Sequence, residues 1–148
     1  MSRLNYYRAS PAGMKTIDNV YAHVLQSGLS KTLIDLVFLR VSQINGCAYC
    51  IDMHSHEVLK DGVTIEKLLL VPVWREGGRL FEETERAALA WAESVTRVAE
   101  TGVPEADYEA AAAVFDAAQL TELTIAIGLI NAYNRMAISF RTTPESVK

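Results

Sequence analysis

The chain has 148 residues, half of them apolar, which is enough to bury one sizeable core, so we expect a single domain over residues 1–148. Its 14 basic and 18 acidic residues give a net charge of -4 with no basic run to neutralise phosphates, which argues against a nucleic-acid partner. The N-terminus lacks the apolar core of a signal peptide, and polar residues interrupt the apolar stretch 123–138, so we expect a cytoplasmic protein outside the membrane.

Apolar residues recur with helical spacing along the whole chain, and this predicts an all-α, single-domain bundle of about six to seven helices. In the first half, each expected helix begins at a capping residue and ends at a glycine or before a proline. These helices span residues 10–28, 30–45, 47–61 and 64–71. The inward face of the first is expected to carry Met14, Ile17, Tyr21, Val24 and Leu25.

The second half is expected to open with a loop over 74–78, followed by helices over 82–101, 105–115 and 121–140. The last of these is apolar on nearly every side, so it should lie at the centre of the fold or between subunits. Polar residues interrupt it and need buried partners, which we expect in the backbone or in a neighbouring subunit. They are Asn131, Asn134 and Arg135.

The only two cysteines, Cys47 and Cys50, lie three residues apart where the helix 47–61 is expected to begin. A bridge across so short a loop restricts the unfolded chain little, so the pair indicates redox or metal chemistry. At about 100° per residue, both cysteines share one helix face with His54. In the first turn, free N–H groups and the positive end of the helix dipole favour a thiolate, with which His54 can exchange a proton.

Asp35, twelve residues before Cys47, is the expected orienting group for His54. A turn at Asn45-Gly46 would fold the two helices together and bring the carboxylate to the imidazole. The competing interpretation is that Asp35 is a surface acid near a helix start. With two cysteines, a sulfenic acid formed by peroxide condenses with the neighbouring thiol, and an external thiol or dithiol resets the disulfide.

A metal site is the sharper alternative, because Cys47, Cys50, His54 and His56 offer four ligands within ten residues. His56, however, lies about 200° around the helix from His54, so the four cannot converge on one tetrahedral ion. We therefore expect no metal and no cofactor. An inert buried cysteine pair and a thiol redox sensor remain as further alternatives.

The run from Arg40 to His54, RVSQINGCAYCIDMH, closely resembles the core of the AhpD-like alkylhydroperoxidases in the carboxymuconolactone decarboxylase superfamily. The resemblance extends less sharply through residues 85–90 and 130–135, so it covers most of the chain. It implies an all-α fold with a helical hairpin around the CxxC pair and an enzyme that reduces organic hydroperoxides. The decarboxylase of the superfamily needs no dithiol, so the CxxC pair points away from that reaction.

The resemblance also implies the role of each site residue. Cys50 is the nucleophile that attacks the peroxide, Cys47 resolves it, and His54 works with an upstream acid as a proton relay. The family has glutamate where this chain has Asp35, and its best-studied members have a second histidine inside the CxxC where this chain has Tyr49. The expected partners are a hydroperoxide, a lipoyl or thioredoxin-like reductant and further copies of the chain in a trimer or hexamer.

Overall fold

The computed structural model describes residues 2–148, and within this range the chain forms only helices and turns. The all-α single-domain bundle is thereby confirmed, although its α-helices number nine in the described residues, more than the six or seven expected. They are α1 (Tyr6–Ala9), α2 (Pro11–Val24), α3 (Lys31–Asn45), α4 (Ala48–Lys60), α5 (Ile65–Leu70), α6 (Glu83–Thr96), α7 (Val98–Thr101), α8 (Glu105–Ala112) and α9 (Ala117–Ser139), with 3₁₀ helices η1 (Val71–Glu76), η2 (Gly78–Leu80) and η3 (Glu145–Val147).

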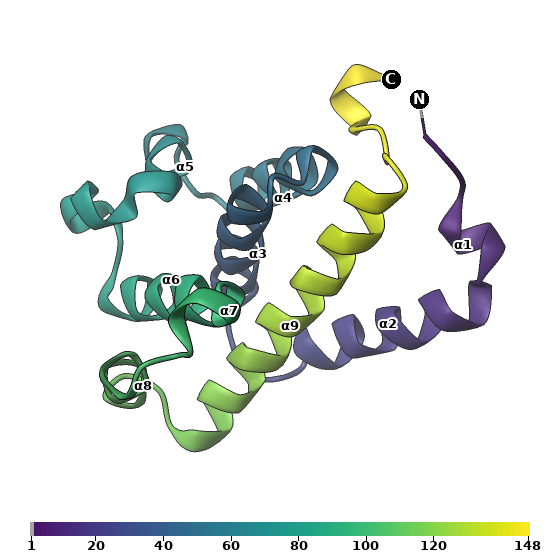
Figure 1. The fold of residues 1–148 in the computed structure, drawn as a ribbon. Helices are drawn as coiled ribbons and strands as arrows, with labels where there is room; N and C mark the ends of the chain where they lie inside the picture. The colour runs from purple at the N-terminus through teal and green to yellow at the C-terminus, as the bar shows by residue number, and fades with distance from the viewer. Residues whose placement is uncertain (1) are drawn as a thin grey trace.

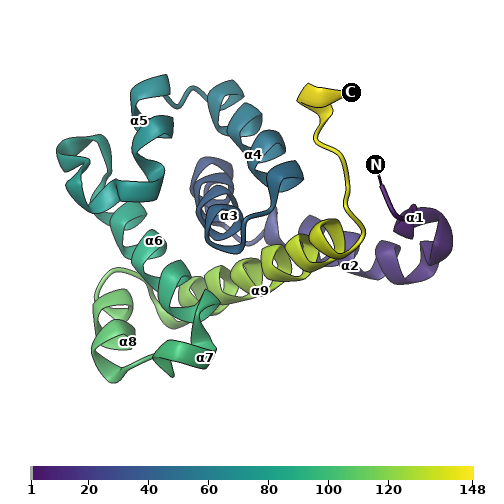
Figure 2. The ribbon, with the colours of Figure 1, turned by 45° about the horizontal axis from the view of Figure 1, so that its top comes forward.

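Helix α3 lies at the centre of the bundle and packs against α4, α6 and α9. Figure 2 shows it almost end-on, with these three helices around it. Ser30 begins α3 by accepting the backbone N–H of Leu33, and Gly46, at φ 69°, ends it. Because its apolar residues point in all directions, α3 contributes to two core clusters, one towards α2, α6 and α9 and one towards α4 and η1.

Helix α9 crosses the molecule and packs against α2, α3 and α6, which places it at the centre of the fold (Figure 1). It begins at Ala117 rather than at the expected residue 121, because Asp116 forms a capping box with Gln119. Both chain ends lie near its C-terminal end (Figures 1 and 2), where the Arg3 N–H donates to the Phe140 carbonyl at 2.8 Å.

Four local expectations are corrected by the structure. The helix expected over 82–101 divides at Arg97, where ψ is 34° and the Thr101 hydroxyl instead binds the Ser94 carbonyl. The expected loop 74–78 is largely the 3₁₀ helix η1, because Trp74 buries its ring there. The helix expected over 105–115 stops at Ala112. Leu25, expected to face inward, follows the end of α2 and is exposed.

Within residues 2–148, no single helix has both the length and the apolar composition needed to cross a membrane. Helices α8 and α9 meet that test only when they are taken together, and they are bent by 120° relative to each other.

Candidate active site

The CxxC pair is formed where α3 turns into α4. After the left-handed Gly46, Cys47 has extended backbone, and its N–H donates to the Ser42 carbonyl at 3.0 Å. Cys47 is therefore the N-cap of α4 rather than part of its first turn, a correction of one residue. Its Sγ accepts the N–H of Cys50 at 3.3 Å, so the sulfur itself satisfies one of the free donors at the helix start. A disulfide joins Cys47 and Cys50.

Both sulfurs are almost completely buried, with exposed fractions of 1% for Cys47 and 2% for Cys50. The two cysteines differ in what they face. Cys50 lines a cavity of about 260 Å³, whereas Cys47 is not among the lining residues. A small molecule in the cavity would therefore contact Cys50, whereas Cys47 lies outside the cavity and is bonded to Cys50.

Asp35 and His54 are brought together, as the sequence predicts. Asp35 is 1% exposed and His54 is 5% exposed, and the distance from His54 Nδ1 to Asp35 Oδ1 is 3.7 Å. At that separation His54 Nδ1 has no hydrogen-bond partner within residues 2–148. The imidazole also packs against the edge of Phe38 and lines the same cavity as Cys50. The interpretation of Asp35 as a surface acid is wrong.

Lys31 is the site residue that the sequence analysis missed. Its Nζ donates to Asp35 Oδ2 at 2.6 Å, to Asp61 Oδ2 at 3.1 Å and to Glu57 Oε2 at 3.5 Å. Lys31 precedes Asp35 by four residues on the same helix, a spacing that is itself a signal for a side-chain pair. One oxygen of the buried carboxylate is thus held by a lysine and the other faces the histidine.

These contacts decide the charge of Asp35. Burial alone would raise the pKa of the carboxyl, but the neighbouring His54 and Lys31 side chains outweigh it and hold the pKa of Asp35 below its usual value. The hydrogen bond to Asp35 in turn raises the pKa of Lys31. The site therefore holds a buried carboxylate that stays ionised at neutral pH, 3.7 Å from an imidazole nitrogen.

The cavity is lined mainly by aromatic side chains. Five of the chain's six tyrosines contribute to its wall, together with Phe38 from α3. The sequence analysis did not find this site, because the tyrosines come from four helices that are distant in the chain. They are Tyr6, Tyr7, Tyr21, Tyr49 and Tyr133.

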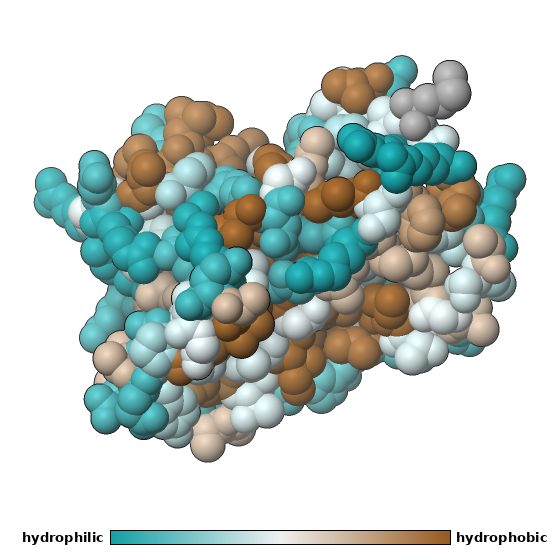
Figure 3. All heavy atoms as spheres, in the orientation of Figure 1, coloured by the Kyte–Doolittle hydropathy of each residue, from teal (hydrophilic) through white to brown (hydrophobic). Residues whose placement is uncertain are grey.

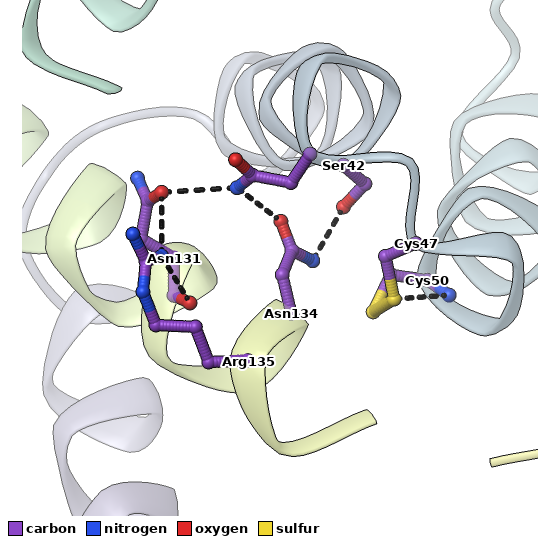
Figure 4. The surroundings of a disulfide bond; sticks show 7 residues. Ser42, Cys47, Cys50, Asn131, Asn134 and Arg135 are labelled. Carbon is purple, nitrogen blue, oxygen red and sulfur yellow. Dashed lines mark hydrogen bonds between the residues drawn. A yellow bond between two sulfur atoms is a disulfide. The ribbon is translucent and has the colours of Figure 1, made fainter. Parts of the chain in front are cut away.

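A buried amide network fixes the end of α3 against α9, close to the CxxC turn (Figure 4). The Asn45 amide donates to the side-chain oxygens of Asn131 and Asn134, both at 2.9 Å, and Asn134 donates to the Ser42 hydroxyl at 3.0 Å. The backbone partners that we expected are found for two of these residues, since Asn131 Nδ2 donates to the Ile127 carbonyl and Arg135 to the Asn131 carbonyl, both at 2.9 Å. Asn134 instead binds side chains.

His56 and His23 lie apart from this arrangement. His56 is exposed, and its Nδ1 binds the Asp52 carbonyl, while His23 pairs with Glu122 on the surface. In the described part of the chain no group of three or more histidine, cysteine or acidic side chains is arranged to hold a metal ion.

The fold and this geometry define a helical bundle that carries a CxxC pair at a helix N-terminus, together with a buried acid and histidine. A family model described as the Carboxymuconolactone decarboxylase family matches residues 11–94, more than half of the chain, and the chain belongs to that family. The resemblance to its AhpD-like members is also confirmed by similar proteins whose names refer to AhpD.

Three of the proteins that are similar to this chain illustrate the relationship. A crystal structure from Agrobacterium tumefaciens, of a protein of unknown function whose name links it to the antioxidant defence protein AhpD, is 42% identical with a TM-score of 0.93 and covers 97% of this chain and 98% of that one. The uncharacterized YdfG of Bacillus subtilis is 34% identical, over 93% of this chain and 92% of its own length. The alkyl hydroperoxide reductase AhpD of Hyphomonas neptunium is 46% identical over 41 residues, 28% of this chain and 23% of its own.

Proposed function

We propose that this protein is a thiol-dependent peroxidase that reduces organic hydroperoxides through a dithiol/disulfide cycle of Cys47 and Cys50. The observation that carries the proposal is that Cys50 and His54 line one cavity while Cys47 adjoins Cys50 outside it. A nucleophile open to a substrate, a proton-exchanging group beside it and a second thiol in bonding distance are the parts that this reaction needs.

In the first step, His54 accepts the proton of the reduced Cys50 thiol. The thiolate attacks the terminal oxygen of the hydroperoxide, so that an S–O bond forms and the O–O bond breaks. The alkoxide leaves as an alcohol with the proton that His54 returns, and Cys50 becomes a sulfenic acid. The Asp35 carboxylate, on the other side of the imidazole, stabilises the imidazolium formed between the two proton transfers.

In the second step, the Cys47 thiol attacks the sulfenic sulfur of Cys50. The S–S bond forms, and the hydroxyl leaves as water with the Cys47 proton. An external dithiol, from a lipoyl or thioredoxin-like protein, then supplies two electrons and two protons and returns both cysteines to thiols. We place this cycle in the cytoplasm, where such reductants keep thiols reduced.

The decarboxylase reaction in the family's name is the main competitor. Its substrate carries a carboxylate, and among the described residues that line the cavity there is no lysine or arginine to pair with one. That reaction would also leave the cysteine pair without a role. Both points favour the peroxidase.

The test is the rate at which the reduced protein loses its thiols when a slight excess of cumene hydroperoxide is added. We expect fast loss of both thiols in the parent and loss of the single remaining thiol, ending at the sulfenic acid, in Cys47→Ser. Cys50→Ser should react no faster than a cysteine in an unstructured peptide. The same slow rate in the parent would refute the proposal.

Turnover separates an enzyme from a redox sensor. With dithiothreitol or reduced dihydrolipoamide present, an enzyme consumes many equivalents of hydroperoxide, whereas a sensor consumes one. Consumption that stops after one equivalent per chain, with reductant still in excess, would favour the sensor.

We also propose a homo-oligomer, a trimer or hexamer. Most of the large apolar residues of α9 are buried within one chain, although Ile125 and Ile138 are exposed. The main support therefore comes from an exposed apolar patch on α5 and η1, formed by Ile65, Leu69 and Val73. Leu69 is 68% exposed, and Figure 3 shows hydrophobic residues gathered over α5 at the upper left. Light scattering that gives the monomer mass as the only species would refute this assembly.

A further inference from the structure

The cavity that Cys50 opens into combines aromatic walls with unbalanced negative charge. Six of the thirteen lining residues are tyrosine or phenylalanine, and Ile130, Ala137 and Met53 add further apolar surface. The acids Asp18 and Glu57 also line it, whereas the lining residues, all of them described, include no lysine or arginine. A ligand would therefore meet π-faces and carboxylates, with His54 as the single group able to carry a positive charge.

Asp18 forms the polar end of the cavity. Its Oδ1 accepts the hydroxyl of Tyr133 at 2.7 Å and that of Tyr7 at 3.1 Å. Both phenols thus direct their only hydroxyl hydrogen to Asp18 and have none for a bound anion. Burial and, next, the charge of Asp18 raise the pKa of Tyr7 to about 12, so this phenol stays neutral.

The two acids differ in how their charge is balanced. Glu57 lies 3.5 Å from Lys31 and 2.7 Å from Lys60, so two cations offset it. Asp18 forms no salt bridge with any residue of 2–148 in the structure, and its partners are the two neutral phenols. Asp18 is therefore the source of uncompensated negative charge in the cavity.

The size of the cavity suits a small ring. An apolar cavity of about 150 Å³ in another protein binds benzene. The cavity here measures about 260 Å³, which leaves room for a benzene ring with a branched three-carbon substituent. Stacked or edge-on contacts with tyrosine and phenylalanine favour an aromatic ring over an aliphatic group of the same volume.

We infer that the cavity selects a neutral, single-ring aromatic hydroperoxide and rejects one that carries a carboxylate, with Asp18 as the residue that determines this charge preference. The inference rests on the proposed function, because a hydroperoxide must place its O–O bond at Cys50 for the reaction to proceed. It adds to that function the chemical class of the group attached to the peroxide.

The test uses the unreactive alcohol products, so that it does not depend on turnover. The oxidised protein is titrated with 2-phenylpropan-2-ol and with the same alcohol bearing a para-carboxylate, and binding is followed by the NMR shifts of the tyrosine rings. We expect the parent to bind the neutral alcohol at least about tenfold more tightly than the carboxylate, a factor that corresponds to about 1.4 kcal/mol. tert-Butyl alcohol, which has no ring, should also bind at least about tenfold more weakly.

Asp18→Asn removes the charge and keeps an oxygen that can accept the two phenol hydroxyls. Asp18→Asn should reduce the ratio of the two dissociation constants, carboxylated alcohol over neutral alcohol, by at least about threefold. Glu66→Gln is the matched control, because it makes the same change of charge at an exposed position on α5, which does not line the cavity. Its ratio should equal that of the parent.

Equal binding of the two aromatic alcohols, tighter binding of the carboxylate, or no binding of either at millimolar concentration would overturn the inference. An unchanged ratio in Asp18→Asn would remove Asp18 from it. If the neutral alcohol is preferred but no hydroperoxide is consumed, the proposed function fails while the assignment of the cavity stands. The two failures are thus distinguishable.

Discussion

Two buried carboxylates, Asp35 on α3 and Glu93 on α6, differ in how completely they are paired. Glu93, on α6, accepts Arg40 Nε at 2.8 Å and Trp74 Nε1 at 3.0 Å, and it also binds Arg75. Burial opposes its ionisation, but these donors outweigh burial and hold the pKa of Glu93 below its usual value. None of the three donors titrates near neutral pH. The Glu93 cluster is therefore a permanent connection between α3, α6 and η1.

Asp35 has only one permanent partner, Lys31. Its second oxygen faces His54 Nδ1 at 3.7 Å, beyond hydrogen-bond distance, and this imidazole lies beside a cavity. Burial of an acid therefore does not by itself identify an active site. What distinguishes Asp35 is a histidine partner that is incompletely bonded and lines a cavity able to hold a ligand.

The difference between Asp35 and Glu93 is tested most strongly by a substitution at His54. We expect His54→Gln to slow oxidation of Cys50 by cumene hydroperoxide by about 10²–10⁴-fold, because general acid–base catalysis contributes about that factor. The pH profile for alkylation of the reduced protein should move to higher pH, since an imidazolium no longer supports the thiolate. Glu93→Gln is the control, and its folded protein should react within about threefold of the parent. An unchanged profile in His54→Gln would remove His54 from the mechanism.

Glu93→Gln should instead affect stability. It leaves the Arg40 guanidinium buried without its anion, so we expect the free energy of unfolding at pH 7, measured with urea, to fall by about 2–4 kcal/mol. Because the folded-state pKa of Glu93 is depressed, its contribution is complete above the unfolded-state value and is lost as the pH falls through the folded-state value. The difference between parent and variant should therefore shrink between about pH 5 and pH 3. A difference that is constant over this range would contradict the assignment.

The amide network offers a smaller effect. Asn134→Ala leaves the buried Ser42 hydroxyl and the Asn45 amide each with one partner fewer, so the free energy of unfolding should fall by about 1–3 kcal/mol. Asn19→Ala, at an exposed position on α2, should change it by less than about 0.5 kcal/mol. Urea denaturation of both variants measures this. If Asn134→Ala were as stable as Asn19→Ala, the amide network would not fix the CxxC turn.

Much of the fold was predictable because its signals are local. The capping serine at residue 30 and the left-handed Gly46 gave the bounds of α3 from short sequence patterns. The break at Arg97 and the burial of Trp74 were not predictable, because tertiary contacts produce them: the ring of Trp74 is held by Glu93, nineteen residues further along the chain. Periodicity carries no information about such distant partners.

The same division applies to the candidate site. The shared helix face of Cys50 and His54 follows from spacing alone, and the turn at Gly46 brings Asp35 to them. The cavity does not follow from spacing, since Tyr7 and Tyr133 meet at Asp18 although 126 residues separate the two phenols in sequence. What the sequence could not predict is therefore the aromatic wall of the cavity around Cys50 and His54.

The smallest expected effect on the rate of Cys50 oxidation comes from Lys31. This lysine pairs with Asp35, whereas Glu93 is paired with arginines. Lys31→Met removes a positive charge that lowers the pKa of Asp35, so that Asp35 then binds a proton more easily and no longer supports His54 as a carboxylate. The acidic limb of the rate of Cys50 oxidation should therefore move to higher pH, with a rate near pH 5 about two- to fivefold below that of the parent and little change at pH 8. The factor is modest because Lys31 is partly exposed, and ion pairs of this kind contribute about 0.2–1 kcal/mol. Lys60→Met makes the same change of charge beside Glu57 without touching Asp35, and its profile should follow that of the parent. If the two variants shift the profile equally, Lys31 acts only through general charge, and Asp35 depends on His54 alone for its orientation.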